Sequence, residues 1–276
     1  MAIERYFTDD NLFRVKSDFG FLVDMIVSSY GEFDLAIRDN YFNIYYKGNS
    51  LAKVTPIRGN AYDVRINSKF FKDTSASTDN RFEVKAENGE CNLKLDKGLV
   101  HPFFQKKHLL EFASNIKAEA YCEELVFEQS LITDNMKRED FIFIDRQITD
   151  TELKRKRLDL LALRKVNNNR YTFLVTEIKL GNNVELEEEV ANQLQTYINH
   201  IKSHFIDYKN CYERQYKQKK ELGLITGLID QEIEIIEPVS GIVIVGLYSG
   251  LAAEKIKNLL GRHPEINIHT CFNDKI

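Results

Sequence analysis

Short apolar stretches separated by polar turns fill most of the first hundred residues, after an opening segment with helical spacing. That spacing predicts a helix over 10–30, and the polar stretch 72–80 is expected to be a loop. Asp39-Asn40 and Lys47-Gly48-Asn49 stand where hairpins must reverse. Strands are predicted over 33–37, 41–46, 51–55, 62–66, 81–85 and 91–95. This half is therefore expected to be an α+β domain with a mainly antiparallel sheet.

The hydrophobic period changes after His101-Pro102. Longer stretches with helical spacing now alternate with apolar runs that have strand character. Helices are predicted over 105–131, 184–208 and 252–260, and strands over 141–148, 157–163, 171–180, 242–247 and 266–271. The order α-β-β-β-α-β-α-β predicts an α/β fold with a mixed central sheet. We therefore expect two domains, 1–104 and 105–276, of which the first has no assigned role.

One buried stripe and an acidic start mark the helix predicted over 184–208. Its acidic run, Glu185 and 187–189, lies in the first turns, where negative charge suits the helix dipole. Either Asn182 or Asn183 is a suitable cap. The stripe consists of Leu186, Val190, Leu194, Ile201 and Phe205. The helix dipole is sufficient to explain the acidic run.

Composition places the 276 residues among soluble globular proteins, with 43% hydrophobic and 29% charged residues. The formal net charge is -4 and the pI is about 5.9, so a polyanion would have to bind a local basic patch. The first residues have no apolar run of signal-peptide length, and 241–253 is too short to span a bilayer. We expect a cytoplasmic protein that does not bind membranes. The four cysteines lack CxxC spacing, which fits reduced thiols.

Two histidines stand four residues apart on the helix predicted over 184–208. His200 and His204 could share a metal ion at this spacing. The His-Glu-x-x-His signature of zinc proteases needs a glutamate after the first histidine, and Ile201 stands there. We interpret both as histidines on the helix surface.

Charged residues interrupt two of the apolar strands. Glu177 and Lys179 project from the same side of one strand, and Asp159 stands within an apolar run of the preceding strand. A Glu-x-Lys pair alone is usually a half-exposed ion pair. Burying two carboxylates is costly, so their combination beside a lysine suggests a cation between them. Carboxylate oxygens suit Mg²⁺ or Mn²⁺.

These residues resemble the signature of the PD-(D/E)XK nuclease superfamily, which has the restriction-endonuclease-like fold. Asp159 matches the first acid of that signature, and Glu177-Ile178-Lys179 matches its second half, while Leu158 replaces the proline. The sequence around Asp159 and over Glu177-Ile178-Lys179 is similar to that of RecB-type and NucS-type nucleases. In the RecB-like branch a Gln-x-x-x-Tyr motif follows, and Gln193 and Tyr197 reproduce it on one helix face.

The resemblance covers 105–276 and implies a metal-dependent phosphodiesterase that acts on nucleic acid, with DNA as the first expectation. It implies that Asp159, Glu177 and the carbonyl of Ile178 hold Mg²⁺ or Mn²⁺. Lys179 would orient or activate a water and stabilise the pentacovalent phosphorus, while Gln193 and Tyr197 would position the strand or the metal waters. For these two, an amphipathic helix with a polar border is the structural alternative.

The family often adds an acid from the helix before the first strand. Four residues compete for that role: Glu119, Glu123, Glu124 and Glu128. We choose Glu124 because it continues an apolar row from Ile116 through Ala120 to Phe127 and Leu131, and should point inward.

A basic run precedes the strand that carries Asp159. Lys154, Arg155, Lys156 and Arg157 are suited to neutralising phosphates, and such runs are also common on solvated faces. A catalytically idle module of the same fold, binding nucleic acid or a protein, is the alternative function. A doubly wound nucleotide-binding domain is disfavoured because no glycine-rich phosphate loop follows a strand. Restriction, phage defence and DNA repair are all compatible, and a homodimer is one open option.

Overall fold

The computed structural model describes residues 3–153, 157–225 and 232–271 and divides into two compact units. The N-terminal unit comprises residues 4–134 and 214–225, and the C-terminal unit comprises residue 3 together with 135–153, 157–213 and 232–271. The division falls after Asp134, whereas the sequence analysis placed a boundary after 104. The reason is that Leu109, Phe112 and Ile116 belong to the hydrophobic core of the N-terminal unit.

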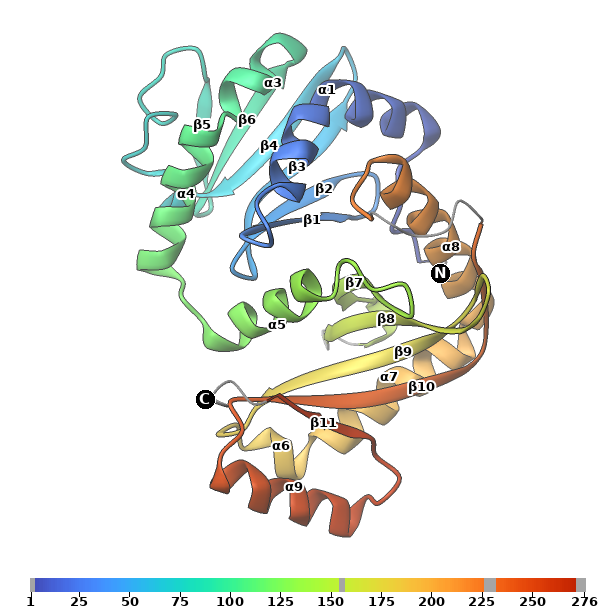
Figure 1. Cartoon of the computed structure of the whole chain (residues 1–276). Helices are drawn as coiled ribbons and strands as arrows, with labels where there is room; N and C mark the ends of the chain where they lie inside the picture. Colours follow the sequence, from blue (N-terminus) through green and yellow to red (C-terminus); the bar gives the residue numbers. More distant parts are fainter. Residues whose placement is uncertain (1–2, 154–156, 226–231, 272–276) are drawn as a thin grey trace. The chain divides into compact units, whose positions relative to one another are not determined.

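An antiparallel sheet of six strands forms the centre of the N-terminal unit, in the order β1-β2-β3-β4-β6-β5 (Figure 1). In the strand over 61–67, Tyr62, Val64 and Ile66 are buried while Arg65 is exposed, which is the alternation of a sheet with one face on a core. The strands are β1 (Phe33–Ile37), β2 (Phe42–Tyr46), β3 (Asn49–Ile57), β4 (Ala61–Asn67), β5 (Val84–Glu87) and β6 (Glu90–Asp96). The predicted antiparallel sheet is confirmed.

Five helices accompany this sheet: α1 (Asp9–Val27), α2 (Ser68–Phe71), α3 (Lys97–Phe103), α4 (Lys106–Glu119) and α5 (Glu123–Asp134). Phe19 of α1 lies edge-on to Phe42 and Tyr62 of the sheet, with ring centroids 5.1 and 4.8 Å away. The single helix predicted over 105–131 is wrong, because it divides into α4 and α5. At the break, the Asn49 side chain donates a hydrogen bond to the carbonyl of Ala120 (3.1 Å), whose φ of -143° is not helical.

A mixed sheet of five strands, ordered β11-β10-β9-β8-β7, forms the centre of the C-terminal unit. Strands β7, β8 and β9 are antiparallel neighbours, whereas β9, β10 and β11 run parallel. The strands are β7 (Phe141–Thr149), β8 (Arg157–Asn167), β9 (Arg170–Leu180), β10 (Glu234–Gly246) and β11 (Ile268–Thr270). The predicted α/β class and its mixed sheet flanked by helices are confirmed. Strand β10 begins eight positions before its predicted start at Ile242.

Helix α7 packs on strands β9 and β10 (Figure 1). Its close approach depends on Gly241, where a Cβ atom would lie 2.6 Å from Cδ1 of Ile198. The single helix predicted from 184 is replaced by α6 (Glu185–Glu188), α7 (Val190–Ser203) and α8 (Phe205–Glu221), and α9 (Gly250–Arg262) packs against α6. A 3-10 turn, η1 (Thr151–Leu153), follows β7. Across the described ranges, no helix has the length and apolar character needed to cross a membrane.

Candidate active site

Strands β8 and β9 separate at the end where the predicted acids lie. Their described pairing ends at Leu160 and Thr176, while β8 stays paired with β7 as far as Arg157. Beyond this point the backbone N–H of Ile178 donates a hydrogen bond to Oδ2 of Asp159 at 2.9 Å. A carboxylate from β8 thus takes the position that a backbone carbonyl would occupy in a continued ladder.

The backbone carbonyl of Ile178 also faces this opening between β8 and β9. In a strand, the N–H and C=O groups of one residue point the same way, so the Ile178 carbonyl is directed toward the side of β8 where Asp159 lies. The side chains of Glu177 and Lys179 project from the opposite face to that of Ile178. They are only 2% and 6% exposed, so both charges lie in the interior.

Three charged side chains form a cluster next to Asp159, of which Glu177 and Lys179 are buried and Glu185 is partly exposed. Nζ of Lys179 lies 3.1 Å from Oε1 of Glu177 and 2.7 Å from Oε2 of Glu185. Burial acts to lower the pKa of Lys179, but the charges of Glu177 and Asp159 and the hydrogen bond to Glu185 raise it overall. The hydrogen bond from Lys179 lowers the pKa of Glu185. The lysine is therefore a fixed cation between two carboxylates.

Helix α7 contributes Gln193 and Tyr197 to the same cluster. Tyr197 is buried, and its hydroxyl donates a hydrogen bond to the carbonyl of Arg157, the first residue of β8 (2.9 Å). Burial raises the pKa of the Tyr197 hydroxyl, and the charges of Glu177 and Asp159 raise it further. The tyrosine stays a neutral hydrogen-bond donor that fixes the start of β8.

Gln193 connects the helix to the charged cluster through Glu185. Its side chain hydrogen-bonds the Glu185 carboxylate, which contributes to lowering the pKa of Glu185. Its Oε1 atom is buried and has no hydrogen-bond partner among the described residues. An amide oxygen shielded from water in this way normally has a donor or a cation beside it.

The donor atoms at this opening are all oxygens. They comprise the carboxylates of Asp159 and Glu177, the carbonyl of Ile178 and the orphaned amide oxygen of Gln193. Mg²⁺ and Mn²⁺ prefer such ligands, whereas zinc sites favour nitrogen and sulfur. The residues present therefore fit the metal that the sequence analysis expected.

The acid chosen from the preceding helix, Glu124, belongs to a different unit from this cluster. It is half-buried on α5, in the N-terminal unit, whereas β8, β9 and α7 belong to the C-terminal unit. The apolar row used to choose it is interrupted between α4 and α5, so Ile116 and Phe127 do not lie on one continuous helix. The more buried acid of α5 is Glu128, which is 3% exposed.

Only part of the predicted phosphate-binding run can be placed. Arg157 is exposed at the first position of β8. Lys154, Arg155 and Lys156 lie outside the described residues.

Glu185 is the residue of the cluster that the sequence analysis missed. Its place in an acidic run at a helix start gave a sufficient explanation through the helix dipole. The only signal for another role was its position in the first turn after the strand that carries Lys179. The ion pair at 2.7 Å depends on how the chain reverses between β9 and α6.

Comparison with known proteins gives little to set beside this geometry. No protein-family model matches the sequence, and no curated protein matches it. Among solved structures, the crystal structure of a repair endonuclease from Pyrococcus abyssi is similar over 88% of this chain and 78% of that chain, with 16% sequence identity and a TM-score of 0.28. No statement about the function of this chain follows from that likeness.

Proposed function

We propose that this protein is a metal-dependent nuclease that hydrolyses phosphodiester bonds of nucleic acid, with DNA as the first substrate to test. The observation that carries the proposal is the buried Glu177–Lys179 ion pair next to Asp159, at the point where β8 and β9 separate. An ordinary structural ion pair does not require a further carboxylate, such as Asp159, at an opening between two strands. A phosphodiesterase needs both acids for a cation and a positive side chain for the phosphate.

Asp159, Glu177 and the carbonyl of Ile178 would hold Mg²⁺ or Mn²⁺. When bound, such an ion neutralises charge on the phosphate and lowers the pKa of a coordinated water. Their placement on two adjacent strands supports this assignment, because strand-borne ligands are held more rigidly than loop-borne ones.

The chain's own side chains supply positioning and charge. Lys179, held between Glu177 and Glu185, offers a fixed positive charge to the phosphate oxygens. Gln193 orients Glu185, and Tyr197 anchors the first residue of β8 through its hydroxyl. Arg157, with the basic run 154–156 before it, would contact phosphates along the strand.

A cleavage assay tests this proposal, with Asp159→Asn as the active-site variant. Asp140→Asn is a matched control, because it makes the same change at an exposed carboxylate that pairs with Arg138. Wild type and both variants are incubated with labelled single-stranded DNA, duplex DNA and RNA in Mg²⁺, in Mn²⁺ or in EDTA. Circular dichroism of each protein verifies that it is folded.

Cleavage by wild type and Asp140→Asn, absent in EDTA and lost in Asp159→Asn, is the expected result. The substrate that is cut then names the class of nucleic acid. If folded Asp159→Asn cleaves as fast as wild type, the assignment of Asp159 is wrong. If wild type binds nucleic acid but cuts none of the substrates with either metal, the catalytically idle module replaces the nuclease.

A further inference from the structure

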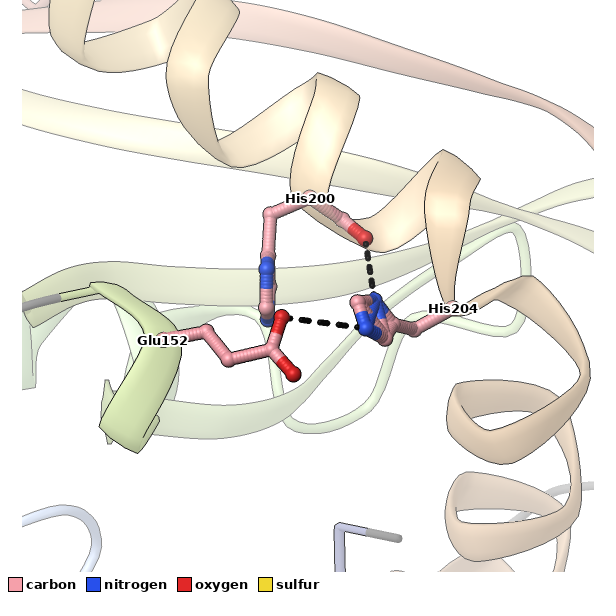
Figure 2. Close-up of side chains that lie close together, drawn as sticks. All are labelled: Glu152, His200 and His204. Atoms are coloured by element: carbon pink, nitrogen blue, oxygen red, sulfur yellow. Dashed lines mark hydrogen bonds and ion pairs between the residues drawn. The ribbon is translucent and has the colours of Figure 1, made fainter. Parts of the chain in front are cut away.

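A second cluster of potential metal ligands lies at the C-terminal end of α7. His200 and His204 project from this helix, and Glu152 reaches them from η1 (Figure 2). One ligand atom from each of the three side chains lies within 4.8 Å of the other two. Oε2 of Glu152 is 3.1 Å from Nε2 of His204.

The hydrogen bonds of His204 indicate what its second nitrogen requires. Nδ1 of His204 lies 3.4 Å from the backbone carbonyl of His200, as Figure 2 shows. A carbonyl oxygen only accepts hydrogen bonds, so this contact places a proton on Nδ1. Nε2 of a neutral ring then directs a lone pair at the Glu152 carboxylate. A metal ion placed between these two atoms would bind both of them.

His200 also faces a carboxylate. Its Nε2 lies 3.1 Å from Oδ2 of Asp150, and its side chain is only 8% exposed. The sequence analysis placed His200 on the helix surface, and this is wrong because Asp150 and the ring of Tyr208 cover it.

Proximity of the two rings suits a shared metal ion. Their centroids are 4.8 Å apart, so one ion can contact a nitrogen of each ring. One divalent ion satisfies both nitrogens and the carboxylate together. The carbonyl that accepts from Nδ1 of His204 also supplies the outer contact that metal-bound histidines usually have.

We propose that His200, His204 and Glu152 form a binding site for a divalent transition metal of the Zn²⁺ type, with the Asp150 carboxylate beside it. Two imidazoles and a carboxylate suit Zn²⁺ and leave a fourth position for water or Asp150. In a tetrahedral zinc site the ligand atoms are about 3.3 Å apart, so side-chain movements of about 1 Å complete the geometry.

This site is distinct from the carboxylate centre of the proposed nuclease. Its ligands come from η1 and the C-terminal end of α7, whereas the carboxylate centre is built on β8 and β9. The metal would tie η1 to α7 next to the start of β8, which Tyr197 also holds. The role of this metal is therefore structural. The proposal of the metal site does not depend on the proposal of the nuclease.

Metal titration tests the site without reference to activity. Metal-free protein is titrated with Co²⁺, whose visible absorption reports a low-coordinate nitrogen and oxygen site, and with Zn²⁺ against a chromophoric chelator. His204→Ala and Glu152→Gln each remove one ligand. His263→Ala is the matched control, because His263 also faces a carboxylate, that of Glu265 at 3.5 Å, outside the cluster.

Asp159→Asn separates the two centres within the same titration. We expect one Zn²⁺ per chain, with affinity unchanged in His263→Ala and Asp159→Asn. In His204→Ala and Glu152→Gln the affinity should fall at least about 10-fold, since even outer contacts of a metal site are worth 10- to 100-fold. Circular dichroism of the metal-free proteins shows whether each variant is folded.

Two results would overturn the inference. One is wild-type protein that binds neither Zn²⁺ nor Co²⁺, which leaves the histidines as hydrogen-bond partners of the carboxylates. The other is binding that Asp159→Asn abolishes while folded His204→Ala and Glu152→Gln retain it, which assigns the metal to the carboxylate centre. Because Glu152 is exposed, its variant stays informative even if His204→Ala does not fold.

Discussion

Replacing Lys179 by methionine should destabilise the protein far more than a typical substitution of a lysine. The change keeps the length and apolar bulk of the side chain but removes the cation that lies 3.1 Å from Glu177, which is only 2% exposed. At 3.1 Å, the Lys179–Glu177 attraction is about 5 kcal/mol at an effective dielectric constant of 20. The cost of burying both charges opposes this attraction, and removing one partner of a buried pair costs about 3–5 kcal/mol. We expect a loss in that range for Lys179→Met.

Urea unfolding followed by far-ultraviolet circular dichroism measures this loss, since the chain has no tryptophan to report by fluorescence. Glu185→Gln should cost no more than about 1 kcal/mol, because its side chain is 41% exposed. Lys165→Met, at a half-buried position near the other end of β8, should change stability by about 0.5 kcal/mol at most. The double variant Glu177→Gln/Lys179→Met should lose less than the sum of its single changes. A loss below about 1 kcal/mol for Lys179→Met, with no coupling to Glu177, would refute the buried ion pair.

Two further predictions concern the packing of each unit. Burial acts to raise the pKa of Asp18, but hydrogen bonds from Lys97 and Tyr62 lower it overall, so its stabilising effect is present above about pH 4 and lost as pH falls through the lowered value. Asp18→Asn should therefore flatten the acid side of the stability curve measured by urea unfolding at each pH, and an unchanged slope would contradict this. Gly241→Ala should lower stability by about 1–3 kcal/mol, because the new Cβ meets Cδ1 of Ile198 at 2.6 Å. Thermal unfolding measures this loss, and an unchanged midpoint would show that α7 is not closely packed on β10.

The strands were predictable because period-two alternation and long apolar runs are local signals. The strand over 61–67 alternates regularly, and β8 and β9 are apolar apart from a few charges. The same contrast predicted Asp159, Glu177 and Lys179, since a charge within an apolar strand stands out in the sequence. In the structure, Asp159 accepts a hydrogen bond from the backbone of Ile178, and Glu177 pairs with Lys179.

Contacts between residues distant along the chain determine the features that were not predicted from the sequence. At the break between α4 and α5, Asn49, which is distant along the chain, hydrogen-bonds the carbonyl of Ala120, and the break removed the basis for choosing Glu124. Helical spacing alone also did not predict that α4 packs in the N-terminal core or that α5 belongs to the same unit. The roles of Glu185 and Glu152 were not predicted, because their contacts with Lys179 and His204 depend on how the chain reverses after β9 and after β7.

The most direct test of the proposed nuclease is the cleavage rate of Glu177→Gln beside Glu234→Gln. Both changes turn a glutamate of the same sheet into its amide, but Glu234 is half-exposed and pairs with Arg170 at the other end of β9, about 23 Å along the strand from Glu177. With Mg²⁺ or Mn²⁺ and the preferred substrate, we predict wild-type cleavage for Glu234→Gln and at least about 100-fold slower cleavage for Glu177→Gln. Equal rates for the two folded variants would contradict the assignment of the active site to this cluster.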